Sequence, residues 1–167
     1  MIAGRAEMDT LQGENVDTGK TMIRLTDQMR DLLKSAISDG TPCIVGTASK
    51  DGRPQVSPKG SVAVYDDEHL CFWERSFRSS YAQISENPQI VIYYRNAARA
   101  PEMPYLGGAI RFHGVGRIIK EGPERDRAWA LTPIEERNRD PDGKGCAVLV
   151  RVDRVEELSG KTIMQRD

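Results

Sequence analysis

Hydrophobic positions follow a helical spacing at the start of the chain and a strand-like spacing after residue 42. Thr26 can cap a helix whose apolar face recurs at the helical period, and Gly40 follows its last turn. That face consists of Leu25, Met29, Leu32, Leu33, Ala36 and Ile37. The pattern predicts one amphipathic helix that packs against the strands that follow it.

Short apolar runs separated by turn residues predict antiparallel strands. These runs cover residues 43–48, 61–65, 70–73, 90–94, 109–119 and 146–152. The apolar run at 146–152 is continuous, which indicates burial on both faces. Short helices are expected over 78–87 and 124–131, with one further turn over 134–139. No parallel crossover pattern occurs, so the chain is expected to be mainly β, a small barrel of five or six antiparallel strands with short helices.

Two strands contain residues that disturb regular pairing. The return strand after the Asp51-Gly52 turn is interrupted at Ser57-Pro58-Lys59-Gly60-Ser61. This segment fits an edge that resists pairing with another chain, and it equally fits a bend where a flat ligand lies against the backbone near Lys59. In 109–119, Gly114 and Gly116 predict that the strand bends, as at the corner of a barrel.

Arg78-Ser79-Ser80 stands where a strand ends and a helix begins. Free backbone N–H groups, two hydroxyls and a guanidinium at one place can hold an anion, most simply a phosphate. A serine cap with a solvated arginine explains the same residues, and the three residues alone favour it. His113 fits a base or hydrogen-bond donor, but a packed or interface histidine is the more common case.

Charge and cysteine content exclude several classes of protein. The chain of 167 residues has 24 basic and 25 acidic side chains, a balance that argues against nucleic-acid binding. Cys43, Cys71 and Cys146 are far apart and lie beside apolar residues, which indicates buried thiols rather than disulfides. Without a close cysteine pair and with 2 histidines, no zinc or other metal site is expected. No apolar run reaches the roughly 20 residues that span a bilayer, so a cytoplasmic protein without membrane contact is expected.

The composition divides the chain into an arm and one domain. Residues 1–21 contain three glycines and no sustained period, so they are expected to form an arm that is disordered or that lies on a partner. Residues 22–167 are expected to form the domain. The long connection from Arg95 to Gly108 is expected at the opening of a ligand site, because it is long and holds Tyr105 among prolines.

The order of four segments resembles the pyridoxamine 5'-phosphate oxidase-like family of FMN-binding split barrels. The segments are Leu25-Thr26-Asp27-Gln28-Met29, residues 46–54 with the Asp-Gly-x-Pro turn, Ser57-Pro58-Lys59-Gly60-Ser61, and residues 84–91 with Asn87-Pro88. The resemblance covers residues 25–157. It implies a six-stranded antiparallel split barrel that forms a two-fold homodimer, with two FMN molecules at the subunit interface, each contacted by both chains.

The resemblance also implies which residues hold the cofactor. It places Ser57, Pro58, Lys59, Gly60 and Ser61 beside the isoalloxazine ring and ribityl chain. It places Trp73 and Glu74 near the ribityl chain or phosphate, and Arg78, Ser79, Ser80 and Gln83 at the phosphate. We hypothesise that Lys59 supplies positive charge near the flavin N1 and O2. No catalytic acid or base is assigned.

Two departures from the family pattern narrow the expected function. The oxidase proper usually offers an Arg-Lys pair to the phosphate, where this chain has Ser79-Ser80, so Arg78 or Lys59 must supply the charge. The segment after Val155 lacks the Arg and His pattern that helps the true oxidase bind its pyridoxine substrate, so oxidation of vitamin B6 is not expected. The expected function is that of an FMN-dependent oxidoreductase for an unidentified small molecule. The alternatives are a relative that uses F420 or haem, and a non-catalytic flavin-binding or electron-carrier protein.

Overall fold

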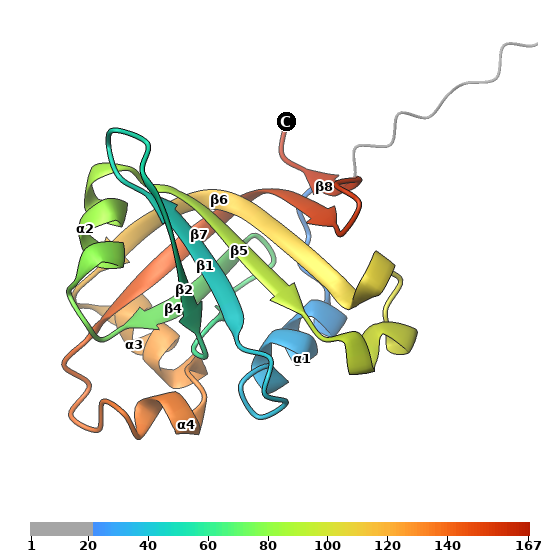
Figure 1. Cartoon of the computed structure of the whole chain (residues 1–167). Helices are drawn as coiled ribbons and strands as arrows, with labels where there is room; N and C mark the ends of the chain where they lie inside the picture. Colours follow the sequence, from blue (N-terminus) through green and yellow to red (C-terminus); the bar gives the residue numbers. More distant parts are fainter. Residues whose placement is uncertain (1–21) are drawn as a thin grey trace, which may run out of the picture.

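A computed structural model describes residues 22–167, so the expected arm over 1–21 lies outside the described residues (Figure 1). In chain order the elements are α1 (Asp27–Ser35), β1 (Cys43–Ala48), β2 (Pro54–Lys59), β3 (Ala63–Val64), β4 (His69–Glu74), α2 (Ser79–Glu86), β5 (Gln89–Arg95), η1 (Ala97–Glu102), η2 (Leu106–Gly108), β6 (Ala109–Ile119), α3 (Pro123–Leu131), α4 (Ile134–Arg137), β7 (Cys146–Glu157) and β8 (Thr162–Gln165).

The strands form one antiparallel sheet that curls around its own core (Figure 1). Their order is β2-β1-β5-β6-β7-β4-β3, and β8 pairs with β7. Since β2 and β3 are the two ends of this order, the barrel stays split between them within residues 22–167. The prediction of a mainly β split barrel is therefore confirmed. The six-strand count is wrong, because the sheet holds eight strands, of which β3 has 2 residues and β8 has 4, too few for a clear period.

The helices are short, and α3 packs against β4 and β7. Thr26 caps α1 as expected, accepting a hydrogen bond from the Met29 backbone N–H at 3.2 Å. The helix ends at Ser35, two residues before the predicted last apolar position, Ile37. Within residues 22–167, no helix is both long enough and apolar enough to cross a membrane.

Two hydrophobic clusters form because β4 and β7 are buried on both faces. The main cluster fills the curl and contains the fully buried Phe72 and Phe112. The second lies on the other side of β4 and β7, where Trp73 packs with Ala128 of α3. The two-sided burial predicted for the last apolar run is confirmed over Cys146–Val150.

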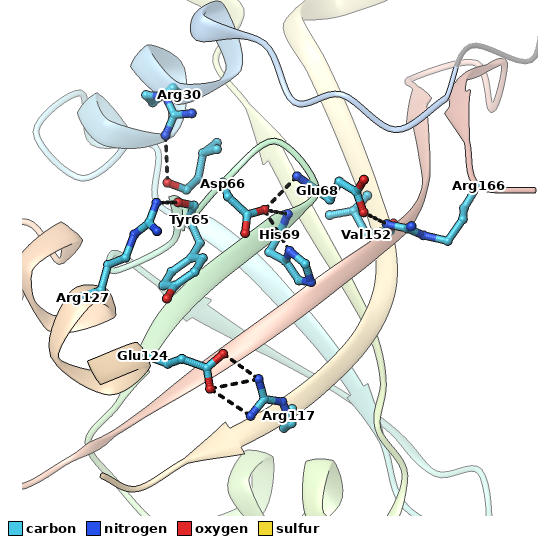
Figure 2. Close-up of polar contacts among 11 residues, drawn as sticks. Arg30, Tyr65, Asp66, Glu68, His69, Arg117, Glu124, Arg127, Val152 and Arg166 are labelled. Atoms are coloured by element: carbon cyan, nitrogen blue, oxygen red, sulfur yellow. Dashed lines mark hydrogen bonds and ion pairs between the residues drawn. The ribbon is translucent and has the colours of Figure 1, made fainter. Parts of the chain in front are cut away.

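The turn between β3 and β4 is fixed by side chains from several elements (Figure 2). Asp66 Oδ1 accepts hydrogen bonds from the backbone N–H groups of Glu68 and His69, both at 2.8 Å. Arg30 of α1 and Arg127 of α3 donate to backbone carbonyls at the end of β3, at 3.1 and 2.6 Å. Burial raises the pKa of Asp66, but these N–H groups and His69 lower it by more, so the pKa lies below its usual value. The contacts hold the two-residue strand β3 at one edge of the split.

Strand β6 changes register against β7 between His113 and Gly114, at the first of the two glycines where the sequence predicts a bend. A Cβ at Gly114 would collide with the backbone carbonyl oxygen of Arg151, which cannot rotate away. A Cβ at Gly116 would meet the end of the Ile90 side chain, which can rotate away. The first glycine is therefore required by the backbone and the second by side-chain packing.

This contrast gives a prediction for stability. We expect Gly114→Ala to lower the free energy of unfolding by about 3 kcal/mol and Gly116→Ala by about 1 kcal/mol, since overpacking costs most where nothing can move. Urea unfolding of both variants measures the difference. Equal losses of unfolding free energy in the two variants would show that the Arg151 backbone moves aside as easily as the Ile90 side chain.

The three cysteines are buried and unpaired, as the sequence predicts. Burial raises the pKa of Cys43 and of Cys71 to about 12 and that of Cys146 to about 11. At neutral pH the thiolate, which is the reactive form, is therefore scarce at all three positions. Cys43 and Cys71 act as small apolar side chains, Cys43 in the main cluster and Cys71 in the second.

The connection from 95 to 108 packs against α1. Gln28 Nε2 donates to the Glu102 carbonyl at 2.6 Å, Arg99 Nη1 donates to Ser35 Oγ at 2.9 Å, and Tyr105 is buried in the main cluster. None of its residues lines the pocket described below. The expectation that this connection lies at the ligand opening is wrong within the protomer, because its apolar residues are used to cover the core beside α1.

Candidate functional site

A pocket of about 880 Å³ opens at the split of the barrel. Its walls come from the ends of β2 and β4, the start of α2, and the segment from α4 to residue 140. Nine of the eleven residues predicted at the cofactor line it: Ser57, Pro58, Lys59, Gly60, Trp73, Glu74, Arg78, Ser79 and Ser80. Residues distant in sequence therefore meet because the split brings the edge strand β2 close to β4.

The Ser57 segment resolves into an edge strand that also lines the pocket. Strand β2 stays in register through Pro58, which lies opposite Ile44, so proline does not end the strand. Since β2 is an edge, the missing N–H of Pro58 leaves no ladder partner unsatisfied. Ser57 and Lys59 line the pocket, so the segment is an edge strand, and a ligand lying against it stays a prediction.

Ser61 and Gln83 do not line the pocket, although both were predicted at the cofactor. The buried Ser61 hydroxyl donates to the Trp73 carbonyl at 3.2 Å and accepts from the Trp73 N–H at 3.0 Å. Gln83 Oε1 accepts from the Thr47 hydroxyl at 2.6 Å. Both side chains therefore satisfy neighbouring polar groups and tie elements together.

Glu74 lies at the centre of the site with 0% of its side chain exposed. Its Oε2 accepts from Lys59 Nζ at 2.6 Å and from Ser80 Oγ at 2.7 Å. Its Oε1 accepts from the Ser76 backbone N–H at 3.1 Å and from Ser76 Oγ at 3.2 Å. Every polar group needed to bury a carboxylate is thus present within the chain.

The contacts of Glu74 keep it ionised. Burial raises the pKa of this carboxyl, but the hydrogen bond and charge of Lys59, with the hydrogen bonds of Ser80 and Ser76, lower it more. The net result is a pKa below the ordinary value of 4.5. At neutral pH a carboxylate paired with Lys59 therefore lies beside the predicted phosphate position.

This pairing changes the role of Lys59. Its side chain is 14% exposed, and its charge is matched by the Glu74 carboxylate across the split. Lys59 is therefore ion-paired within the protomer, and its supply of charge near the flavin N1 and O2 stays a prediction. Together with Glu74 it connects β2 to β4 where no strand pairing does.

Arg78 is the pocket-lining cation without an ion pair among residues 22–167. It occupies the N-cap position of α2, and no side chain caps this helix, so the predicted serine cap is absent. The first intrahelical hydrogen bond runs from the Ala82 N–H to the Arg78 carbonyl at 3.0 Å, so the preceding N–H groups of the first turn have no helical acceptor. Arg78, the exposed Ser79 hydroxyl and these N–H groups form a seat for an anion.

The segment after α3 contributes residues that the sequence did not reveal. The buried Glu136 accepts from Arg139 Nη1 at 3.1 Å and lies 3.9 Å from Arg75 Nε, and all three line the pocket. The sequence predicted only a helical turn over 134–139, because a carboxylate between exposed charges has no distinctive pattern. The structure shows that this turn closes one side of the site.

Asp140 holds the neighbouring loop against Trp73. Its Oδ2 accepts from Trp73 Nε1 and from the Gly145 N–H, both at 2.8 Å, and its Oδ1 accepts from the Lys144 N–H at 3.0 Å. Burial raises the pKa of Asp140, but these donors lower it more, so the pKa lies below its usual value. The Trp73 indole also packs on Trp129, with ring centroids 4.6 Å apart. Trp73 is therefore a fixed part of the pocket wall.

His113 lies outside the pocket, in a charged cluster on β6 and β7. Glu156 Oε2 lies 3.0 Å from His113 Nε2 and 2.9 Å from Arg111 Nη1, and its Oε1 lies 2.8 Å from Arg154 Nε. Burial raises the pKa of Glu156, but Arg111 and His113 lower it more, so the pKa lies below its usual value. Of the two readings of His113, the structure supports the packed one within the protomer.

Comparison with known proteins identifies the family. Residues 25–158 match the family model described as pyridoxamine 5'-phosphate oxidase. The chain belongs to the pyridoxamine 5'-phosphate oxidase family. An uncharacterized protein of Methanocaldococcus jannaschii is 27% identical over 113 residues, which are 66% of this chain and 70% of that protein.

Solved structures share the fold of this chain. HupZ of Group A Streptococcus is 24% identical with a TM-score of 0.59, covering 82% of this chain and 97% of that one. An FMN-binding protein of Syntrophomonas wolfei is 12% identical with a TM-score of 0.58, covering 79% of this chain and 87% of that one. At these identities the structures establish the split-barrel fold alone.

Proposed function

We propose that this chain binds FMN in the pocket at the split of the barrel and acts as an oxidoreductase on a small molecule. The observation that carries the proposal is the anion seat at the start of α2, at one end of the pocket. Arg78, Ser79 and the N–H groups of the first turn form this seat. The resemblance of the Ser57–Ser61 segment to FMN-binding split barrels supports the same assignment.

The pocket fits the proposed cofactor in size and in the distribution of its polar groups. Its volume of about 880 Å³ is within the range of small-molecule sites, about 300–1,000 Å³. The edge strand β2 offers a flat backbone surface at Ser57 and Pro58, suitable for a planar ring. Arg78 at the other wall can pair with a phosphate through two parallel N–H donors.

The chain's own residues would bind and orient the cofactor. FMN supplies hydride or electron transfer when it is bound. Arg78 and Ser79 would hold its phosphate, while Trp73, fixed by Asp140, would keep the wall between them and β2 in place. The Lys59–Glu74 pair would present a neutral polar surface inside the pocket.

The pocket chemistry also bears on the alternative cofactors. Solved proteins of similar fold include an F420 reductase and the haem storage protein HutZ of Vibrio cholerae, with TM-scores of 0.52 and 0.51. Haem iron is held by histidine, cysteine, methionine or tyrosine. None of these residue types is among the pocket-lining residues of the described chain. This favours a flavin-like ligand with an anionic group over haem.

We propose further that the protein is a homodimer in the cytoplasm, with each cofactor at the interface. The dimer is supported by the family, and the location by three buried cysteines without disulfides, as is usual in a reducing compartment. Light scattering during size-exclusion chromatography tests the dimer. A monomeric holoprotein would contradict an interface site.

The absorbance spectrum of the purified protein tests the proposed function. We expect a flavin spectrum, release of FMN on denaturation, and oxidation of NAD(P)H with a suitable acceptor. A haem or deazaflavin spectrum would replace FMN as the cofactor. Bound flavin without turnover for any acceptor would indicate an electron carrier or a flavin-binding protein instead of an enzyme.

Replacement of Arg78 tests the anion seat. We expect Arg78→Ala to weaken FMN binding at least tenfold, since a charged hydrogen bond contributes about 1.5–3 kcal/mol, and to leave riboflavin binding unchanged. Titration followed by flavin fluorescence measures both constants. Arg151→Ala removes the same charge from an exposed position outside the pocket and should change neither. Equal weakening for both flavins would contradict a phosphate contact.

A further inference from the structure

Two adjacent serines at the start of α2 differ in their surroundings. Ser79 is exposed and has no hydrogen-bond partner among the described side chains, whereas Ser80 is 6% exposed and donates to Glu74 Oε2 at 2.7 Å. Both line the same pocket and both carry the same hydroxyl. Only one of them is available to a ligand.

The same carboxylate also holds Lys59. The ammonium lies 2.6 Å from Glu74 Oε2, so one buried oxygen receives both the lysine and the serine. An incoming anion would have to compete with a carboxylate that is already fully hydrogen-bonded and cannot move into solvent. Lys59 and Ser80 are therefore withdrawn from the ligand although they line its pocket.

Glu74 also affects where in the pocket a ligand can carry negative charge. Its negative charge cancels the positive charge of Lys59, so the pair adds no net positive charge beside the anion seat. The seat at Arg78 is thus the part of the site where positive charge is not balanced within the described chain. The local charges favour a ligand whose anionic group reaches Arg78 and whose uncharged part lies beside the Lys59–Glu74 pair.

We propose that Glu74 is a specificity-determining residue that limits the recognition of a ligand's phosphate to Arg78, Ser79 and the first turn of α2. It does so by occupying Lys59 and Ser80 as an internal anion. The proposal rests on the proposed binding of FMN in this pocket. It assigns Glu74 a role opposite to that of an ordinary binding residue, because its removal should strengthen recognition of the phosphate.

The ratio of the riboflavin dissociation constant to the FMN dissociation constant measures how much the phosphate contributes to binding. Both ligands share the ring and ribityl chain, so effects on the rest of the pocket cancel in the ratio. We expect Glu74→Gln to raise this ratio about tenfold or more, since it frees Lys59 for a charged contact and removes a nearby negative charge. In the double variant Lys59→Met/Glu74→Gln the ratio should return close to the wild-type value, because the freed cation is gone.

The two serines provide a test that does not depend on how well Glu74→Gln folds. We expect Ser79→Ala to lower the ratio about two- to tenfold, the usual effect of losing one neutral hydrogen bond to a ligand. Ser80→Ala should leave the ratio within about twofold, because its hydroxyl is engaged by Glu74. Thermal unfolding without ligand confirms that each variant is folded before titration.

The outcomes separate this inference from the proposed function. A raised ratio in Glu74→Gln that returns in the double variant, together with an effect of Ser79→Ala and none of Ser80→Ala, supports the role of Glu74. If wild type binds both flavins but Glu74→Gln leaves the ratio unchanged or lowers it, or if Ser80→Ala matches Ser79→Ala, the role is wrong while the flavin site stands. If wild type binds neither flavin, the proposed function is wrong and this inference fails with it.

Discussion

Replacement of Lys59 by methionine is expected to lower the free energy of unfolding by about 3–5 kcal/mol at pH 7. The variant leaves the Glu74 carboxylate, which is 0% exposed, without its cation. Ser80 and Ser76 still donate to it, but neither carries the charge that offsets its burial. Urea unfolding without ligand measures the loss.

The loss should depend on pH in a defined direction. In the native chain the pKa of Glu74 is below 4.5, so this carboxylate stabilises the fold above that pH, and the contribution disappears as pH falls through the folded pKa. Without Lys59 the effect of burial dominates and the pKa of Glu74 rises, so the variant takes up a proton. The difference between wild type and Lys59→Met should therefore shrink between pH 7 and pH 4.

Two further variants separate the buried pair from charge effects in general. Lys144→Met breaks an exposed pair with Asp142 at 3.0 Å and should cost less than about 1 kcal/mol. The double variant Lys59→Met/Glu74→Leu replaces the buried pair with apolar side chains and should recover most of the loss. A loss for Lys59→Met that is the same at pH 4 and pH 7 would contradict an ionised Glu74.

Replacement of Trp73 by alanine is expected to lower the free energy of unfolding by about 3–5 kcal/mol. The indole is almost fully buried and fills the space between Trp129 and the backbone of Gly145. Its loss also removes the Nε1–H donor from the buried Asp140, which keeps only its backbone donors. The same denaturant experiment measures the effect.

Two substitutions distinguish packing from hydrogen bonding at this position. Trp73→Phe keeps an aromatic ring but not the donor, and should cost about 1–3 kcal/mol. Trp129→Ala removes the half-buried partner ring and should cost less than about 2 kcal/mol. A loss for Trp73→Phe as large as that for Trp73→Ala would show that the contact with Asp140, rather than the volume of the ring, holds the loop.

The sequence predicted the elements of the fold well where side-chain pattern and turn chemistry agree. The cap at Thr26, the Asp51-Gly52 turn and the bend at Gly114 follow from local backbone requirements, so residue type alone predicts them. Strand β8 was missed, because its pairing with the end of β7 is a long-range contact and its 4 residues carry little pattern.

The site was predicted less completely, for a related reason. The segments around Lys59 and Arg78 contain unusual residue combinations, and both line the pocket. Glu136 and Arg139 were missed because they lie in an ordinary charged helical turn, and only the fold brings that turn to the split. Ser61 and Gln83 lie outside the pocket of the protomer, because hydroxyl and amide groups bind neighbouring polar atoms as readily as a ligand.

The sequence by itself determined the fold class and the segments that meet at the pocket. The spacing of hydrophobic residues, the turn residues and the family resemblance predict both. Only the tertiary structure decided which charges in that pocket are available. Lys59 and Arg78 are both cations in unusual segments, yet Glu74 neutralises the first and not the second. Lys59 and Glu74 are 15 residues apart, and they pair because β2 and β4 approach each other across the split. The residues near either one do not predict that approach.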